Sequence, residues 1–325
     1  MLSVGNLEVS RGEKMSGVVS VVDNTGASIE IPVVLTSGVK SGPVLWINAG
    51  IHGTEYPGIE AAIRISRTVT PEELTGTVIV LPIVNTPAFF SRTMYECPMD
   101  NKNLNRVFPG KKDGSMSEAL AFTLMKEVAP EVTHVIDLHG GDTVEALHPF
   151  VAIRKTGNQA VDKISRAFAA YYGTASVLEV SKETEGWTGD GTLFATMAER
   201  GIPALLAEAG GVGQLDEDST LIHYEGVINI MKYLGMLKGR PEKPGRQESL
   251  DSFIWLYSGF EGIFYPHIKA GETVEVEQSI GEVRNFFGEV LEKICSPVQG
   301  RLLVLVDNPA VKKEGLLAQI GRTTV

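Results

Sequence analysis

A histidine and a glutamate, His52 and Glu55, stand three residues apart where an apolar run ends and a helical pattern begins. Residues at positions i and i+3 of a helical turn point the same way, so both side chains can reach one metal ion. Imidazole nitrogen and carboxylate oxygen are normal zinc ligands, and a catalytic zinc keeps three protein ligands and one water. The third ligand should come from another strand end, and His139 holds such a position.

A His-x-x-Glu spacing is a weak signal by itself because it often arises by chance. The chain holds six histidines, and the two predicted ligands lie beside glycines and small residues that leave room for an ion and a substrate. The other four lack a partner at ligand spacing, and we interpret them as surface or core histidines: His134, His148, His223 and His267.

Two carboxylates accompany these candidates. Asp137 could orient His139, because ligand histidines usually donate their other N–H to a carboxylate or carbonyl. Glu208 ends the apolar run 203–207, where partial loss of hydration would raise its pKa and suit it to general base catalysis. The alternative is an edge glutamate that merely meets solvent, and the residues alone leave both interpretations open.

The elements that must position these residues alternate between strands and helices. Short apolar runs predict buried strands at 44–48, 77–84, 133–138 and 203–208, after a hairpin within 17–36. Helical periodicity predicts helices at 55–69, 117–128, 158–172, 192–200 and 219–237. This alternation indicates an α/β fold with a largely parallel sheet covered on both faces, in which ligands bind beyond the carboxyl ends of the strands.

The composition changes at 239–245, a stretch of proline, glycine and charged residues that we interpret as a linker. Beyond it the pattern predicts short strands without a helix. Two segments, 262–281 and 300–321, are similar, and each leads into an Ile-Gly pair. We therefore expect a catalytic α/β domain over 1–240 and a small all-β domain of two similar halves over 246–325.

Four motifs, taken in order, resemble the succinylglutamate desuccinylase/aspartoacylase family, which belongs to the zinc carboxypeptidase-like superfamily. They are His52-Gly-Thr-Glu55, Asn103-Leu-Asn-Arg-Val-Phe-Pro-Gly, Asp137-Leu-His139 and Glu208. The resemblance spans about 44–237. It implies a carboxypeptidase-like, mostly parallel or mixed sheet with helices on both faces, followed by a small barrel-sandwich-like β domain.

Carried over residue by residue, the resemblance implies one zinc ion (Zn2+) per chain, with the ligands His52, Glu55 and His139. Glu208 would be the general base and acid, and Asn105 and Arg106 would bind a substrate carboxylate. The most similar branch contains bacterial N-acyl amino acid deacylases, including deacetylases of acetylated diamino acids. The implied function is therefore hydrolysis of the amide bond of a small N-acyl amino acid.

Two other functions compete with the deacylase. One is a zinc carboxypeptidase that trims peptides, although about 80 residues of extra β domain would tend to obstruct a long chain. The other is an inactive binding module, which the presence of all three ligands and the base candidate disfavours. The stretch 95–100 departs from aspartoacylase because it lacks an arginine that helps to polarise the scissile carbonyl there, and Arg92 is the nearest one. The oxyanion-stabilising group is therefore left open.

The C-terminal region resembles the barrel-sandwich hybrid fold of lipoyl and biotinyl carrier domains. A carrier needs a lysine at its hairpin tip, and the predicted tip at 284–288 has none, so we expect neither lipoylation nor biotinylation. The region could instead narrow the catalytic cleft or mediate contacts in a homo-oligomer, and the sequence does not separate these roles.

Composition narrows the choice of partners. The formal net charge of -11 argues against nucleic acid and anionic membranes, because both require a basic face. The N-terminus lacks a signal-peptide pattern, and no apolar stretch approaches the ~20 residues that span a bilayer. The only cysteines, Cys97 and Cys295, are expected to be free thiols. We therefore expect a cytoplasmic enzyme that acts on a small molecule.

Overall fold

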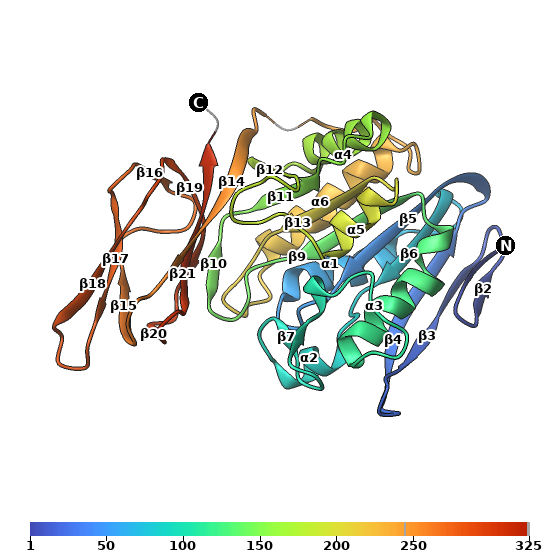
Figure 1. Cartoon of the computed structure of the whole chain (residues 1–325). Coiled ribbons are helices and arrows are strands. Elements are labelled where there is room, and N and C mark those ends of the chain that lie inside the picture. Colours follow the sequence, from blue (N-terminus) through green and yellow to red (C-terminus); the bar gives the residue numbers. More distant parts are fainter. Residues whose placement is uncertain (244, 324–325) are drawn as a thin grey trace.

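The computed structural model describes residues 1–243 and 245–323, and one mixed sheet runs through most of them (Figure 1). Within these residues the sheet has 13 strands. They are β3 (Lys14–Val22), β4 (Ser28–Ser37), β5 (Lys40–Ala49), β6 (Thr75–Leu81), β9 (His134–His139), β10 (Glu145–Leu147), β11 (Phe150–Arg154), β12 (Ser176–Val180), β13 (Ala204–Glu208), β14 (Glu248–Tyr257), β16 (Thr273–Val274), β19 (Gly300–Val306) and β21 (Leu316–Thr323). Their order is β10-β19-β21-β14-β12-β11-β13-β9-β5-β6-β4-β3, with β16 beside β19.

The centre of the sheet is parallel and its margins are antiparallel. Strands β6, β5, β9 and β13 are parallel neighbours. Strand β11 is antiparallel to β13, and β12 runs parallel to both β11 and β14. The predicted hairpin, the four predicted strands and the mixed α/β class are confirmed. Strands β11 and β12 were missed, because each is only five residues long and carries polar or charged residues within or beside its apolar run.

Helices cover both faces of the sheet. Those in the described residues are α1 (Tyr56–Thr68), α2 (Thr86–Ser91), α3 (Met116–Glu127), α4 (Gln159–Tyr172), α5 (Leu193–Glu199) and α6 (Glu217–Tyr233). Helices α1, α4 and α6 pack on one face with Ile47, whereas α3 and α5 pack on the other with Trp46. Successive side chains of a strand point to opposite faces, which is why these two neighbours belong to different clusters. All five predicted helices are confirmed, and α2 is an additional one.

Short elements complete the part of the chain that precedes β14. They are the 3₁₀ turns η1 (Leu104–Arg106) and η2 (Ala129–Glu131), and two small antiparallel pairs, β1 (Leu2–Val4) with β2 (Leu7–Val9) and β7 (Glu96–Cys97) with β8 (Lys102–Asn103). No helix in the part of the chain that the structure describes is long and apolar enough to cross a membrane.

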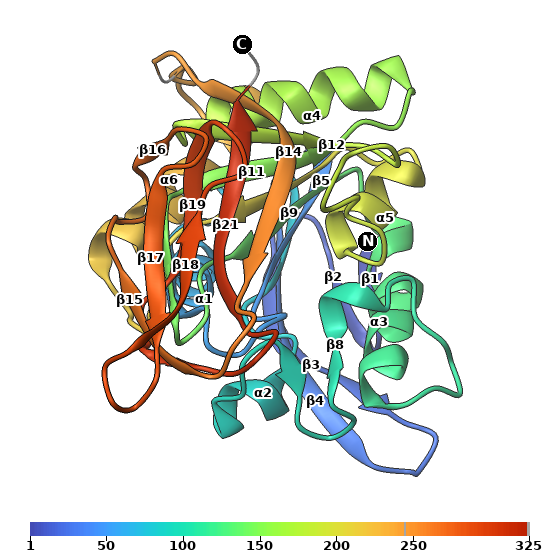
Figure 2. The ribbon, with the colours of Figure 1, turned by 60° about the vertical axis from the view of Figure 1, so that its left-hand side comes forward.

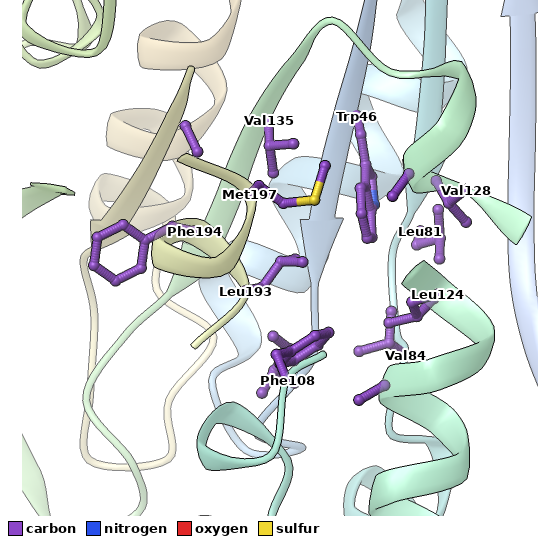
Figure 3. Close-up of a cluster of buried hydrophobic side chains, with 14 of the residues drawn as sticks. Trp46, Leu81, Val84, Phe108, Leu124, Val128, Val135, Leu193, Phe194 and Met197 are labelled. Carbon is purple, nitrogen blue, oxygen red and sulfur yellow. The ribbon is translucent and has the colours of Figure 1, made fainter. Parts of the chain in front are cut away.

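The core under α3 and α5 fixes the elements nearest the predicted site. Figure 3 shows the indole of Trp46 with Met197 of α5 on one side and Leu81 and Val128 on the other. Trp46 is 0% exposed, and full burial of a large apolar side chain stabilises the fold by on the order of 2–3 kcal/mol. This packing holds α5, and the loop that precedes it, firmly against the sheet.

The C-terminal region is all-β, as predicted, but its strands divide between two sheets. A separate four-stranded antiparallel sheet contains β15 (Gly262–Pro266), β17 (Ser279–Arg284), β18 (Val290–Cys295) and β20 (Ala310–Val311). Strands β14, β19 and β21 instead extend the large sheet, because β14 pairs with β12 on one side and β21 on the other. Figure 2 shows these three strands next to one another. The division at 240 and 246 stays a prediction, and residue 244 of the predicted linker lies outside the described residues.

The two similar segments of this region have the same strand pattern. Each consists of a strand, a two-residue strand and a second strand, namely β15-β16-β17 and β19-β20-β21. The short strands are exchanged, since β16 pairs with β19 and β20 pairs with β15. Ile280 and Ile320, from the two Ile-Gly pairs, are both fully buried in the cluster that the halves share. The exchange indicates that the two halves fold as one unit.

Strands β17 and β18 form the hairpin that the carrier resemblance predicted. Its tip carries Phe286 and Phe287, which are 81% and 89% exposed. The tip contains no lysine. That no lipoyl or biotinyl group is attached there remains our prediction.

Candidate metal and substrate site

The carboxyl ends of three parallel neighbours bring the predicted residues together. Strand β9 ends at His139 and β13 ends at Glu208, and these two residues are paired in register. Strand β5 ends at Ala49, and the turn after it carries His52 and Glu55 into α1. Residues far apart in the chain therefore meet at one edge of the sheet, where open α/β folds bind their ligands.

The side chains of His52, Glu55 and His139 form a compact group. Nδ1 of His52 lies 2.7 Å from one carboxylate oxygen of Glu55, and Nδ1 of His139 lies 2.8 Å from the other. The ligand atoms all lie within 4.8 Å of one another, and all three residues are buried. Two imidazoles and one carboxylate are the donor set of a known class of catalytic zinc sites. The residues present therefore fit the ion that the sequence predicts.

Each histidine of this metal triad has a polar partner at its other ring nitrogen. Nε2 of His52 lies 3.1 Å from the amide oxygen of Asn103, and Nε2 of His139 lies 3.2 Å from a carboxylate oxygen of Asp137. The amide oxygen of Asn103 favours the proton on Nε2 of His52, and Nδ1 of both histidines lies on the side of Glu55. Asp137 accepts a hydrogen bond of 2.9 Å from Asn48, so its own position is fixed. The sequence motif that begins at Asn103 did not predict its contact with His52.

The charges around the triad favour a cation. Burial by itself would raise the pKa of Glu55, but His52 and His139 lower it to about 2. Burial would lower the pKa of His139, but the carboxylates of Asp137 and Glu55 raise it well above its usual range. Two buried acidic side chains thus lie against the imidazoles, and they stabilise positive charge at this centre.

The turn that carries the first two ligands packs tightly on α2. A Cβ atom on Gly53 would come within 2.2 Å of the backbone nitrogen of Phe89. The amide of Asn85, which caps α2, also donates a hydrogen bond of 3.1 Å to the carbonyl of Ile51. Any side chain at position 53 would therefore displace the turn and separate the two ligands.

A pocket of about 320 Å³ opens over the triad, and Glu208 lies in its lining. Burial, and then the negative charge of Glu55, raise the pKa of Glu208 well above its usual range. Its Oε2 atom is buried and has no hydrogen-bond partner among the described residues. An unpaired carboxylate oxygen beside a metal triad is available as a proton acceptor, so the geometry fits the predicted catalytic role better than a solvent-facing edge.

Among the arginines in the described residues, Arg106 alone lines the pocket. The residue is exposed overall, and burial of its guanidinium lowers its pKa against the opposing effect of the charge of Glu208. Its guanidinium donates a 2.8 Å hydrogen bond to the carbonyl of Asn105. No carboxylate of the described residues lies within ion-pair distance of it, so Arg106 is free to bind an anion.

Asn105 lines the same pocket, but its amide is already engaged. Its Oδ1 accepts a 3.0 Å hydrogen bond from the backbone of Leu193, and its Nδ2 lies 3.2 Å from Nε2 of His139. Of the predicted substrate-binding pair, Arg106 is the member open to a carboxylate, whereas Asn105 connects α5 to a predicted metal ligand. Arg92 ends α2 and is absent from the pocket lining in the described residues.

A polar network that no motif indicated holds the stretch before Asn103. Tyr95 lines the pocket in the left-handed backbone conformation, with φ of 54°. Its hydroxyl donates to Glu145 at 2.7 Å, and its backbone N–H donates to Asp142 at 2.9 Å. The other oxygen of Glu145 accepts a 3.0 Å bond from the backbone of Asp142. The tyrosine ring meets His52 edge-on at 6.0 Å, so the network fixes the wall next to this ligand.

The C-terminal region also contributes to the pocket. Phe253, Trp255 and Tyr257 of β14 line it together with Leu316 and Gln319 of β21. The motifs did not indicate these residues. Aromatic residues occupy every second position over 253–257, and this alternation could have predicted from the sequence that they share one face of a strand.

Comparison with known proteins finds relatives of this chain in sequence and in structure. The family model of the succinylglutamate desuccinylase/aspartoacylase catalytic domain matches residues 41–234, which include every predicted site residue. A relative from Halomonas elongata, named N-alpha-acetyl-L-2,4-diaminobutyric acid deacetylase, is 29% identical over 270 residues, which cover 80% of this chain and 76% of the relative.

Two solved structures share the fold over nearly the whole chain. The succinylglutamate desuccinylase/aspartoacylase from Rhodobacter sphaeroides superposes with a TM-score of 0.87 at 24% identity and covers 100% of both chains. The product-bound ectoine utilization protein EutE (DoeB) from Ruegeria pomeroyi superposes with a TM-score of 0.88 at 23% identity and covers 98% of both chains. The shared fold therefore includes the C-terminal β region.

Proposed function

The chain belongs to the succinylglutamate desuccinylase/aspartoacylase family, and on that premise we propose that it is a zinc-dependent amidohydrolase that releases the acyl group from a small N-acyl amino acid. The Halomonas relative supports this reaction class, since its name describes the deacetylation of an N-acetylated amino acid. The substrate would be a small molecule, and the acyl group and amino acid are not specified by the family.

In this proposal His52, Glu55 and His139 hold one zinc ion per chain. When bound, the zinc would polarise the amide carbonyl and lower the pKa of a water molecule toward ~7. Asn103 and Asp137 keep the two imidazoles in the orientation that directs Nδ1 inward. Their role is positioning, because neither faces the centre of the triad with a ligand atom.

Glu208 supplies the proton transfer. A carboxylate next to the attacking water can take its proton and deliver it to the leaving amine nitrogen, which turns the same side chain from base to acid within one cycle. The single observation that carries the proposal is the unpaired, buried Oε2 of Glu208 in the pocket of the metal triad. Both oxygens of Glu145, which lines the same pocket, are by contrast paired.

Arg106 binds the carboxylate of the amino acid. A guanidinium grips a carboxylate through two parallel hydrogen bonds, which fixes the register of the substrate against the metal. The absence of a carboxylate partner among the described residues leaves this grip available. Asn105 supports the same wall through its contacts with Leu193 and His139.

The carboxypeptidase alternative needs an open cleft for a peptide chain. Residues of β14, β19 and β21 line the pocket on the side away from the triad, so the volume of about 320 Å³ suits a small substrate better than a long one. This lining supports the deacylase. An inactive binding module would not need an unpaired base beside three ligands.

A substrate panel tests the proposal. Zinc-loaded protein is assayed against N-acetyl, N-succinyl and N-formyl amino acids, including N-acetyl-2,4-diaminobutyrate, and against blocked dipeptides. We expect hydrolysis of at least one N-acyl amino acid with a kcat/KM well above that of every dipeptide. Cleavage of blocked dipeptides at least as efficiently as every N-acyl amino acid would replace the deacylase with the carboxypeptidase.

A further inference from the structure

One side of the pocket is a largely apolar surface contributed by three strands of the C-terminal region and by β10. We call it the apolar wall, and it consists of Leu147, Phe253, Trp255, Tyr257, Val304 and Leu316. The three aromatic residues alternate along β14, so they share one face of the strand. The rings of Phe253 and Trp255 are 5.0 Å apart, and those of Trp255 and Tyr257 are stacked at 6.3 Å with an interplanar angle of 7°.

The register of the sheet explains how the wall is assembled, with the polar Gln319 within its row. Trp255 is opposite Gln319, Gln319 is opposite Val304, and Val304 is opposite Leu147. Residues directly opposite on neighbouring strands lie on the same face of a sheet. One row of side chains therefore crosses β14, β21, β19 and β10, and every member of that row lines the pocket.

The wall reaches the reacting end of the pocket through Phe150. This residue begins β11 and is opposite Glu208, which in turn is opposite His139. The ring of Phe150 lies 6.3 Å from that of Phe253, so the aromatic surface starts beside the predicted general base. A group attached close to a scissile amide at the metal triad would lie against this surface.

The loop before α5 holds the wall in place. Phe253 N–H donates a 3.1 Å hydrogen bond to the carbonyl of Glu185, and the indole of Trp255 donates a 3.0 Å bond to the carbonyl of Gly186. The next residue, Trp187, also lines the pocket and packs on Phe253 at 5.8 Å. The wall is thus formed before any substrate binds, which lowers the entropic cost of recognition.

The charged residues of the pocket lie apart from the row of the wall. Glu55 and Glu208 belong to the reacting end, and both oxygens of Glu145 are engaged by Tyr95 and by a backbone N–H. The pocket also contains the exposed Glu96 of β7 and Arg106, and neither belongs to the row. An ammonium group placed on the row of the wall would lose hydration, and no carboxylate belongs to that row to pair with it, which is costly. An apolar group would gain about 25 cal/mol for each Å² of surface removed from water.

We infer that the substrate carries a bulky apolar group, aliphatic or aromatic, close to the scissile amide, and that the apolar wall selects it. This inference rests on the proposed deacylase function and specifies its substrate class. The group belongs either to the acyl part or to the side chain of the amino acid, and the chemistry that recognises it is the same in both cases.

Two matched pairs of substrates test the inference and separate the two sources. N-acetyl-L-norleucine and N-acetyl-L-lysine differ essentially by one ammonium group and report on the amino acid side. N-benzoyl-L-alanine and N-acetyl-L-alanine report on the acyl side. We expect kcat/KM to be about 10- to 100-fold higher for the apolar or bulkier member of at least one pair, the range that pocket burial of a few carbon atoms supplies.

Variants assign the preference to the wall. Tyr257 is 53% exposed, so Tyr257→Ala should leave the fold intact and lower the preference ratio about 3- to 10-fold. Leu316→Glu adds a carboxylate to the wall and should move the ratio toward the lysine substrate. Phe287→Ala removes an aromatic ring that is 89% exposed at the hairpin tip, outside the pocket, and should keep the wild-type ratio. Circular dichroism of each variant checks folding.

The outcomes distinguish the inference from the proposed function. If N-acyl amino acids are hydrolysed but N-acetyl-L-lysine and N-acetyl-L-alanine are equal to or preferred over their partners, the inference is overturned and the deacylase stands. A preference that neither Tyr257→Ala nor Leu316→Glu changes also overturns it. If no compound is hydrolysed by zinc-loaded protein, the deacylase proposal fails, and calorimetric titration with norleucine against lysine still decides whether the pocket selects an apolar group.

Discussion

Replacing Glu208 with glutamine removes an ionisable group from the pocket and keeps its shape. The carboxylate ends β13 between His139 and Phe150 on the flanking strands. Its Oε2 atom is buried and unpaired, so an amide group there breaks no hydrogen bond of that atom. Three acidic neighbours, Glu55, Glu145 and Asp137, contribute to the raised pKa of Glu208, and a neutral amide is not repelled by them.

These contacts set the expected magnitudes. The free energy of unfolding should change by less than about 1 kcal/mol, because no hydrogen bond to Oε2 is lost. Zinc content should stay at about one ion per chain, because the three predicted ligands are untouched. The value of kcat should fall by about 100- to 10,000-fold, the contribution of one general acid–base, which corresponds to about 2.7–5.5 kcal/mol in the activation barrier.

The assay measures kcat on the best N-acyl amino acid of the panel, zinc by mass spectrometry and stability by urea unfolding. Glu96→Gln is the matched control, since Glu96 lines the same pocket but is exposed, and its effect on kcat should stay below about 10-fold. A Glu208→Gln protein with full zinc and a kcat within 10-fold of wild type would refute the role of this residue. Loss of zinc in that variant would show that Glu208 is a ligand instead.

Three further predictions follow from other contacts. Arg106→Lys keeps the charge but loses the fork, so KM should rise about 10- to 100-fold while kcat changes less, and steady-state kinetics checks the split. His52→Ala should reduce zinc from about one ion per chain to less than about a tenth, measured by mass spectrometry after dialysis, and an active metal-free wild type would contradict the site altogether. Asp162 accepts hydrogen bonds from Thr156 and Gly157, which lower its pKa against the opposing effect of burial. A lowered folded-state pKa means that this stabilisation is present above the unfolded value of 3.8 and is lost as the pH falls through the folded value, so Asp162→Asn should cost about 1–2 kcal/mol at pH 7 and progressively less below pH 4 in urea unfolding of metal-free protein.

The sequence by itself determined the elements whose signals are local. Apolar runs and helical periodicity identified β5, β6, β9 and β13 and the helices that cover them, because burial on both faces requires an unbroken apolar strand. The same reading placed His52, Glu55, His139 and Glu208 at strand ends. Strands of a parallel sheet align their carboxyl ends, so candidates at those ends are expected to meet, and the structure brings them together in one pocket.

The tertiary structure alone decided what depends on contacts between distant segments. Strand β14 pairs with β12, and this pairing brings the C-terminal strands into the large sheet. The residues of β14 do not predict the pairing, because it also depends on which other strand has an unpaired edge. The same pairing determines that Trp255 faces the triad's pocket, since a shift of one residue in register would turn every side chain of β14 to the other face. The contacts of Asn103 with His52 and of Tyr95 with Glu145 likewise join segments that are far apart in the sequence, so they depend on the tertiary fold. Motifs therefore indicate the predicted reacting groups, whereas the wall that we propose to select the substrate is assembled only by folding.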